Sequence, residues 1–458
     1  MALDWVATEL WALELGDARL HRRLHALVAD LAAQPAASVA QACGGDWAAT
    51  KAAYRLWDTP RVAPQAIRDA QQAAAAARCR DHAAVLVLHD TSLFDYRHHP
   101  ATAGLGPLAH PAQQGFLLHS ALAVSPAGVP LGLLQQTVWT READETGKRR
   151  ARRRRATADK ESQRWLTALA ASEAALPPHV RLITVADREA DIFDLFAQPR
   201  RRGSDLPVRA THNRAVDHAA GYLHEAIAQA PILGRHTLEV GPRPEQEPRR
   251  ATLTLQALPL ALQPPRHHPR RAQLRPIPVT VVLAEEVDPP AGVTPLRWLL
   301  PTTLPAGTAG EAIAVLTHYS RRWLIERYHY VLKSGCRLER LQLQTRARLE
   351  RALASYSLVA WRLLWLTYQA RAEPEGACEA VLARHEWQAL ACAIQRGGAP
   401  PPAPPSLRQA LRWIAQLGGF LGRRHDGEPG VKTLWQGWRR LEDLAAAWRL
   451  LHPDPTYG

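Results

Sequence analysis

The stretch YSRRWLIERYHYVLK, residues 319–333, has the periodicity of one helix that carries a polar stripe. At about 100° per residue, five residues fall within roughly 80° of one another on one face: Tyr319, Arg322, Glu326, Tyr330 and Lys333. The side chains on the opposite face can pack on a core: Ile313, Leu324, Tyr328, Val331 and Leu332. Thr308, placed before Glu311, predicts a capping box at the helix start. Two interpretations remain open, an exposed salt-bridge network and a functional carboxylate flanked by cations.

Length and charge restrict the class of protein. A chain of 458 residues exceeds what one simple core holds, so we expect two or three structural units. Lys and Arg number 57 against 43 Asp and Glu, which gives a net charge of +14. This balance favours a polyanionic partner, with nucleic acid first and an anionic membrane surface second.

The sequence offers no signal for a membrane or an oxidising compartment. No apolar run approaches the roughly 20 residues that span a bilayer, and MALDWVATEL lacks the basic and then apolar order of a signal segment. The cysteines are scattered without a CxxC pair, so we expect neither a disulfide framework nor a cysteine zinc site. We therefore expect a soluble cytoplasmic protein with no membrane partner.

Short apolar runs that end in polar residues predict a central sheet. AAVLVLHDTSLFDY, residues 83–96, is typical of a buried strand whose C-terminal end carries Asp90. FLLHSALAV (116–124) and GVPLGLLQQTVW (128–139) follow as strands joined by the turn signal SPAG. We expect these three strands to form a meander.

A second apolar strand carries another acid at its end. SQRWLTALAASEAAL, residues 162–176, predicts a helix, and VRLITVADREADIFDLF (180–196) then predicts a strand that ends at Asp187. A helix between two such strands indicates a crossover and a parallel pair. If the two strands are adjacent, the carboxylates of Asp90 and Asp187 meet at one sheet edge.

The sequence predicts helices at both ends of the chain. Residues 1–75 alternate helical patterns with polar breaks and predict a small helical domain. Within it Lys51, Tyr54 and Arg55 follow an expected N-cap at Asp46 and can present hydrogen-bond donors to DNA; a solvated basic helix is the other interpretation. Residues 371–458 predict further helices, which are apolar enough for a partner surface as well as for a core. Ser406, after the Pro-rich breaker 397–405, is placed to cap the last pair of them.

Between these ends lie a strand, an insertion and a basic run. LPVRATHNR (206–214) predicts a strand, and LRWLLPTT (296–303) predicts another. The residues between them, from about 215 to 295, are rich in Pro and Arg and predict a mainly β insertion. RRARRRR, residues 149–155, is a dense positive run that suits phosphates, although a solvated basic loop explains it nearly as well.

The three acids Asp90, Asp187 and Glu326 predict a metal site. Carboxylates are the ligands that Mg²⁺ or Mn²⁺ prefers, and three acids at one place repel one another unless a cation lies between them. Two such ions about 3.5–4 Å apart would activate a water or a sugar hydroxyl and stabilise the leaving oxygen at phosphorus. We expect phosphodiester chemistry, although an Asp at a strand end is commonly only a cap.

Three motifs stand in a fixed order along the chain: HDTS around Asp90, VADREADIFD around Asp187, and the pattern Y-x2-R-x3-E-x6-K from Tyr319 to Lys333. Together they resemble the signature of bacterial DDE transposases of the insertion-sequence-four type, most closely the Tn-five kind. The similarity extends to GDARLHRRL and AAYRLWDTP near the start, LRWLL before the signature, and LGGFLGRRHDGEPGVKTLWQGW near the end.

The resemblance implies the fold and the site. It implies an α/β, RNase H-like core, a mixed sheet flanked by helices, over residues 76–370, with the β insertion inside it. It implies that Asp90, Asp187 and Glu326 hold the metal ions and carry the catalysis. The residues that it assigns to DNA contacts are Tyr319, Arg322, Lys333, Arg209 and Trp298, the last by stacking on a flipped base.

The resemblance also implies the reaction and the partners. Water would cut one strand at each element end, and the freed 3′-hydroxyl would attack the opposite strand to make a hairpin. A second water would open the hairpin, and the 3′-hydroxyl would then join target DNA. The partners would be terminal inverted repeats, target DNA and a second copy of the chain in a synaptic complex at the bacterial nucleoid, with residues 1–75 binding the ends and residues 371–458 forming the dimer. A stand-alone structure-selective nuclease and a catalytically silent DNA-binding protein are the alternatives.

Two histidines near the predicted site are left out of it. His89 precedes Asp90 on the same strand, so its side chain should point to the opposite face. His119, in FLLHS, is interpreted as structural. The segments around RRARRRR and QPPRHHPRR depart from the family pattern, so the resemblance does not define how DNA ends are recognised.

Overall fold

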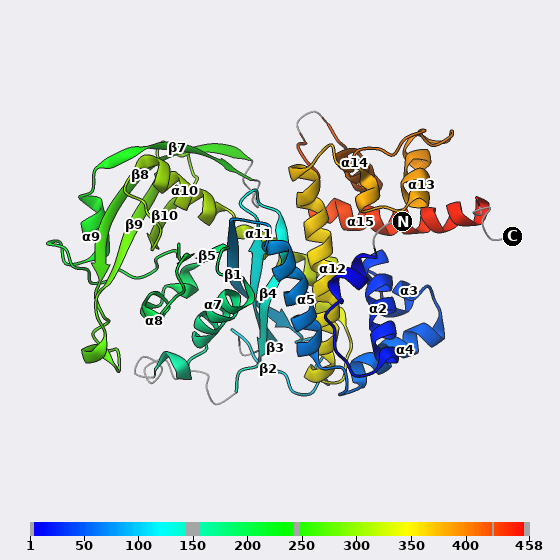
Figure 1. Ribbon diagram of the computed structural model, residues 1–458, viewed down its shortest axis with the longest axis horizontal. Coiled ribbons are helices and arrows are strands. Elements are labelled where there is room, and N and C mark those ends of the chain that lie inside the picture. The colour runs from blue at the N-terminus through cyan, green and yellow to red at the C-terminus, as the bar shows by residue number, and fades with distance from the viewer. Residues whose placement is uncertain (1–3, 111, 143–155, 242–247, 424–425, 453–458) are drawn as a thin grey trace.

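The computed structural model describes residues 4–110, 112–142, 156–241, 248–423 and 426–452. Figure 1 shows a central sheet covered by helices, with an antiparallel β-sheet at one end of the long axis. The N-terminal and C-terminal helices lie at the other end (Figure 1). Within the described ranges no helix is both long and apolar enough to cross a membrane.

The N-terminal part is helical, as expected. Its elements are α1 (Trp5–Glu9), α2 (Ala18–Ala33), α3 (Val39–Ala42), α4 (Trp47–Asp58) and α5 (Pro64–Cys79). Asp46 caps α4 by accepting a hydrogen bond from the Ala48 backbone N–H. The leucines of α2 that recur at helix spacing are buried, which confirms the predicted apolar face: Leu20, Leu24, Leu27 and Leu31.

The central sheet is mixed. Its strands are β1 (Ala84–Asp95), β2 (Gly106–Pro107), β3 (Gln114–Val124), β4 (Pro130–Trp139), β5 (Arg181–Ala186) and β6 (Ser204–Asp205). The order is β2-β3-β1-β5-β6, and β4 also pairs with β3. β1, β3 and β4 pair antiparallel and β1 pairs with β5 in parallel, so the predicted meander and crossover are confirmed.

Helices cover both faces of this sheet, which explains why β1 is apolar without alternation. Leu86 and Leu88 point to the core that includes α11 (Trp323–Tyr330) and α12 (Arg346–Ala372), whereas Val85 and Val87 point to the core around α7 (Gln163–Ala175). The crossover is made by α7 (Gln163–Ala175), and α8 (Phe193–Ala197) follows β5.

The insertion forms its own antiparallel sheet in the order β10-β9-β8-β7, with the short helix α9 (Leu223–Ala228) before it. Its strands are β7 (Ile232–Val240), β8 (Arg249–Leu262), β9 (Ile277–Glu286) and β10 (Arg297–Thr302). β10 pairs with β9, so the insertion sheet extends past the expected end at about residue 295. The strand expected at 206–214 is wrong, because only single bridges from Pro207 and Val208 remain there.

The signature stretch is not one helix, which corrects the prediction from its periodicity. Thr308 and Glu311 form the predicted capping box of α10 (Ala309–Ser320). The backbone N–H groups of Arg321 and Arg322 then donate to carbonyls three residues back, so the chain tightens before α11 (Trp323–Tyr330). A π-helical turn, Val331–Gly335, ends the stretch.

A long helix joins the core to both ends of the chain. α12 (Arg346–Ala372) is buried on most sides, and its Arg351 donates to the backbone carbonyl of Val62 at 2.8 Å. The C-terminal helices are α13 (Arg384–Ile394), α14 (Leu407–Leu417) and α15 (Val431–Leu451). Ser406 caps α14, as its position predicts. The basic run at 149–155 lies outside the described residues.

Candidate active site

Two aspartates occupy corresponding positions on the neighbouring parallel segments that begin as β1 and β5. His89 of β1 lies opposite Ala186 of β5, so Asp90 and Asp187 are the next residues on the two chains. The alternation of β1 puts Asp90 on the same face as Leu88, and its side chain is 17% exposed. The expectation that these two aspartates share one edge of the sheet is met by this register.

The environment of Asp187 is electrostatically unfavourable for a carboxylate. Burial raises the pKa of Asp187, and the negative charge of Asp90 raises it further. A hydrogen bond from the Glu189 backbone N–H, at 2.9 Å from Oδ1, and the charge of Arg322 act in the opposite direction. The two aspartates therefore repel one another across the sheet edge.

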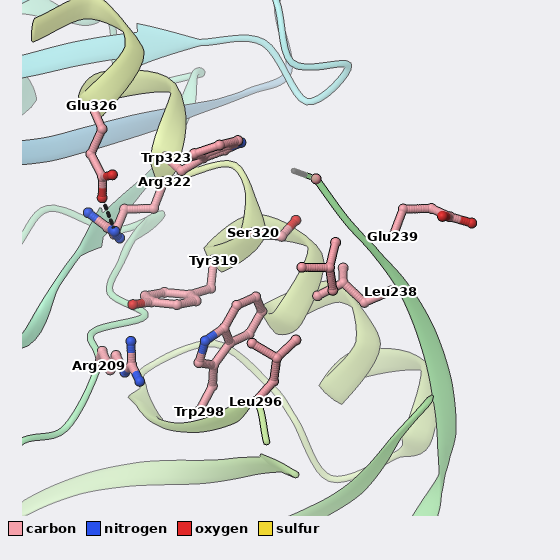
Figure 2. A pocket seen from close by; sticks show the side chains of 12 residues that line it. Arg209, Leu238, Glu239, Leu296, Trp298, Tyr319, Ser320, Arg322, Trp323 and Glu326 are labelled. Carbon is pink, nitrogen blue, oxygen red and sulfur yellow. Dashed lines mark hydrogen bonds and ion pairs between the residues drawn. The ribbon is translucent and has the colours of Figure 1, made fainter. Parts of the chain in front are cut away.

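Glu326 approaches this edge from α11 and is paired with an arginine. Its carboxylate forms an ion pair with the Arg322 guanidinium one turn earlier (Figure 2). The pKa of Arg322 is lowered by burial and raised by Tyr319, Glu326 and Asp90, with a net rise. Arg322 thus interacts with all three carboxylates. We call Asp90, Asp187, Arg322 and Glu326 the edge cluster.

The edge cluster has the donor set of a divalent cation site. Three carboxylates against one guanidinium leave two negative charges, and carboxylate oxygens are what Mg²⁺ and Mn²⁺ bind. Across the described residues no three His, Cys, Asp or Glu side chains are arranged to hold a metal ion. Glu326 is engaged with Arg322 instead. The residues fit such an ion provided that Glu326 leaves Arg322.

A cavity of about 350 Å³ opens beside the edge cluster. It is lined by Arg209, Trp298, Tyr319, Arg322 and Glu326, so five of the predicted residues come together here. Figure 2 shows the Trp298 and Tyr319 rings next to each other, and their centroids are 5.1 Å apart at an angle of 69°. Tyr319 is only 4% exposed, which counts against the alternative of an exposed salt-bridge face at this residue.

Cations surround the Tyr319 hydroxyl inside this cavity. Burial raises the pKa of Tyr319, and the nearby charges of Arg322 and Arg209 lower it. Arg209 also donates to the backbone carbonyl of Arg297 at 3.1 Å, which ties it to the insertion sheet. The cavity therefore combines two guanidinium groups with two aromatic rings, a composition that suits a nucleotide.

Lys333 lies further along the signature stretch, in the π-helical turn. Its Nζ is 3.7 Å from Glu339 Oε1 and 5.3 Å from the centre of the Phe94 ring. The extra residue in a π turn rotates the side chains that follow it relative to a regular helix. Lys333 does not line the cavity, in contrast to Tyr319 and Arg322.

The N-terminal candidates lie apart from the edge cluster. Lys51, Tyr54 and Arg55 are exposed on α4, which belongs to the group of helices at the far side of the core (Figure 1). The Tyr54 ring is 44% exposed and meets Trp57 edge to face, at 6.2 Å between centroids. Trp47, 74% exposed on the same helix, was not singled out from the sequence.

The two excluded histidines are buried away from the carboxylates. His89 stacks on Trp165 of α7, with ring centroids 6.2 Å apart, so it does point to the face opposite Asp90. His119 Nδ1 is 3.0 Å from the Thr91 hydroxyl.

The sequence interpretation missed three contributors to the site. Trp323 and a segment that spans the end of β7 and the next residue, Leu238–Gly241, line the cavity beside Trp298. His329, on α11, is 4% exposed and contacts Asp90. An aromatic next to Arg322 and a histidine one turn after Glu326 were the available signals, but nothing in a single sequence shows which histidine faces a carboxylate.

Comparison with known families agrees with this geometry. Residues 2–62 match the transposase DNA-binding family, residues 136–362 the transposase DDE domain family, and residues 358–450 the Tn5 transposase dimerisation domain family. Asp187 and Glu326 lie inside the range matched to the DDE domain, and Asp90 precedes it.

The RNase H-like fold and the DDE domain define the class of metal-dependent nucleases and transesterases that act on DNA. The three matches follow one another in the order of DNA-binding, DDE and dimerisation domains. The chain belongs to the Tn5-like DDE transposases, and it is a DNA transposase that uses divalent metal. Its DNA-binding and dimerisation domains indicate DNA and a second copy of the chain as partners.

Proposed function

We propose that this transposase moves its element by cut and paste, with Asp90, Asp187 and Glu326 as the ligands of two Mg²⁺ or Mn²⁺ ions. The observation that carries the proposal is the edge cluster, in which the three carboxylates all interact with Arg322. When bound, the ions would supply an activated water and neutralise the charge that develops on phosphorus.

The reaction would consist of successive displacements at phosphorus. Water attacks the phosphate at the element end, the bond from phosphorus to the 3′-oxygen breaks, and a 3′-hydroxyl is released. This hydroxyl attacks the phosphate opposite it on the other strand, the bond from that phosphorus to the 3′-oxygen of the flanking DNA breaks, and a hairpin forms. A second water then attacks the same phosphorus and releases the 3′-hydroxyl again. The 3′-hydroxyl finally attacks a target phosphate, whose own 3′-oxygen leaves.

The cations and rings around the cavity would hold the DNA during these steps. Arg322, once released from Glu326, binds the phosphate next to the reacting bond, and Lys333 and Arg209 bind its neighbours. Tyr319 donates a hydrogen bond to a phosphate oxygen, since burial keeps its hydroxyl protonated. Trp298, half-buried beside Tyr319, stacks on a base turned out of the duplex.

The remaining parts would assemble the complex at the nucleoid. Residues 1–75 bind the terminal inverted repeats through the exposed Lys51, Tyr54 and Arg55 of α4, and residues 76–370 carry the catalysis. Residues 371–458 form the dimer that brings two ends together. The last turn of α15 supports this role, because Leu450 and Leu451 are 85% and 76% exposed there.

One assay tests the proposal. Purified protein is incubated with Mg²⁺, a labelled duplex made from the element end and a supercoiled target plasmid. The proposal predicts hairpin ends, double-strand breaks and labelled target. Cleavage without joining would instead identify a structure-selective nuclease, and a shifted but intact duplex would identify a DNA-binding protein without catalysis.

A further inference from the structure

His329 is buried between Asp90 and the interior of the core. It lies on α11 one turn after Glu326, so one short helix supplies both a carboxylate of the edge cluster and a contact to another. Its Nδ1 is 3.3 Å from Asp90 Oδ2, and its Nε2 is 3.2 Å from the Ser120 hydroxyl. Nδ1 is buried and forms no hydrogen bond with any residue in the described part of the chain. Asp90 is thus the acceptor within its reach.

A line of polar side chains supports the imidazole from behind. Ser120 of β3 lies directly opposite Asp90, and Gln136 of β4 lies opposite Ser120. The Gln136 side-chain nitrogen is 3.3 Å from the Ser120 hydroxyl and 3.1 Å from the Tyr328 hydroxyl. All of these groups are buried. The line therefore runs from the edge cluster into the core without contact with solvent.

This line allows the tautomer of His329 in which Nδ1 carries the proton. The Ser120 hydroxyl accepts a hydrogen bond from Gln136, so its single proton is free to be donated to Nε2 of His329. Nε2 is then the acceptor of the imidazole, and the N–H is on Nδ1, toward Asp90. A carboxylate can only accept, so this tautomer is the one that gives Asp90 a favourable neighbour.

We propose that His329 is a positioning residue that holds Oδ2 of Asp90, so that the other carboxylate oxygen faces the divalent cation. The inference rests on the metal site of the proposed function. A carboxylate ligand that is oriented by a fixed N–H loses less rotational freedom when the ion binds. Removal of the residue that supplies this N–H weakens metal affinity about 10- to 100-fold. The long Nδ1–Oδ2 contact would shorten in the loaded site.

Two substitutions at His329 separate this role from simple packing. In His329→Asn the amide nitrogen takes the place of Nδ1, so the contact with Asp90 is kept and that with Ser120 is lost. In His329→Gln the amide nitrogen takes the place of Nε2, so the contact with Ser120 is kept and that with Asp90 is lost. Packing alone would rank Gln, which is closer to His in length, as the milder change.

The test is Mn²⁺ binding to the full chain by isothermal titration calorimetry, with unfolding followed by circular dichroism. We expect His329→Gln to weaken Mn²⁺ affinity about 10- to 100-fold and His329→Asn to stay near wild type. In cleavage assays His329→Gln should lose more activity with Mg²⁺ than with Mn²⁺. Equal Mn²⁺ affinity in both variants and wild type would overturn the inference.

Failure of the metal site itself gives a different result. If the wild type and Asp90→Ala bind Mn²⁺ equally weakly, the proposed metal site is wrong. If only the His329 variants match the wild type, the metal site stands and the positioning role is wrong. Should His329→Gln not fold, Ser120→Ala removes the support of the ring with a small change in volume. It should weaken Mn²⁺ binding several-fold, and an unchanged affinity would also overturn the inference.

Discussion

Two of the carboxylate–arginine groups in the described part of the chain differ in how their charges are paired. The edge cluster opens on a cavity and has one arginine for three carboxylates. The second group lies where the N-terminal helices, α12 and the C-terminal helices meet. We call it the junction cluster, and it consists of Glu9, Arg78, Arg362, Glu386 and Glu442.

The junction cluster is built around one buried ion pair, Glu9 with Arg78. Glu9 is 2% exposed and forms a bidentate ion pair with Arg78, in which the distance from Arg78 Nη2 to Glu9 Oε2 is 3.1 Å. The Arg78 guanidinium lies 4.2 Å from the centre of the Trp361 ring. Burial lowers the pKa of Arg362 to about 10, against the charge of Glu9. The comparison teaches that a buried ion pair joins parts of this fold at the junction cluster, whereas the edge cluster keeps two net negative charges beside a cavity.

The largest expected effect is loss of chemistry at the edge cluster. Asp187→Ala should reduce strand transfer by at least about 10³-fold, because it removes a ligand on which the whole reaction depends. Binding of the end duplex in a gel-shift assay should stay within a few-fold of wild type. Substantial strand transfer by a folded Asp187→Ala protein would show that the cluster is not the catalytic site.

Arg78→Ala tests the structural role of the junction cluster. It leaves the Glu9 carboxylate buried without its partner, which should lower the free energy of unfolding by about 3–5 kcal/mol. Urea unfolding followed by circular dichroism measures the change. The double variant Glu9→Leu with Arg78→Leu should recover most of the loss, since neither member of this ion pair is then left buried without the other. A double variant as unstable as Arg78→Ala would contradict this account.

Arg322→Ala tests the single cation of the edge cluster. We expect cleavage of the end duplex to slow by about 10²-fold, because a guanidinium beside the reacting phosphate is lost. Arg321→Ala is the matched control, since it removes the same charge one residue earlier. The Arg321 side chain packs over Gly128, where an added Cβ would come within 2.8 Å of it. Equal slowing in both variants would mean that only net charge matters.

Glu442 makes the junction cluster sensitive to pH. Burial raises the pKa of Glu442 to about 7 from an ordinary value of 4.5. The folded state then binds a proton more tightly than the unfolded state, so this contribution to stability is full below pH 4.5 and is lost as pH rises to about 7. The expected loss is about 1–2 kcal/mol after allowance for solvent screening. Glu442→Gln should flatten the pH dependence of the urea midpoint, and an unchanged slope would count against it.

The smallest effect is expected on α4, outside both clusters. Lys51→Ala should weaken binding of the end duplex by about 1 kcal/mol and reduce its salt dependence by about one unit of log–log slope. Lys51→Arg, which keeps the charge, should retain the wild-type slope. Cleavage at saturating DNA should be unchanged. An unaltered salt slope in Lys51→Ala would place the DNA contact elsewhere.

The central sheet could be predicted because its signals are local. Strands covered on both faces are continuously apolar, and the helix between β1 and β5 requires a parallel pair. These two facts alone bring Asp90 and Asp187 to one edge. The N-caps could be predicted as well, because a cap depends only on the next few residues. They are Asp46, Thr308 and Ser406.

The features that periodicity missed depend on tertiary contacts. No Gly or Pro marks the break at Arg321 and Arg322, where backbone hydrogen bonds of the 3₁₀ type separate the end of α10 from α11. Tyr319 is buried at that end of α10. The π-helical turn after Tyr330 likewise turns Lys333 toward Phe94. The contact of His329 with Asp90 joins residues far apart in the chain, so no spacing rule reveals it.

The most direct test of the account replaces one non-bridging oxygen of the scissile phosphate with sulfur. Mg²⁺ binds sulfur poorly, whereas the softer Mn²⁺ tolerates it. If the edge cluster holds a metal ion against that phosphate, one sulfur diastereomer should resist cleavage in Mg²⁺ and be cleaved again in Mn²⁺. Equal cleavage of both diastereomers in Mg²⁺ would contradict the account.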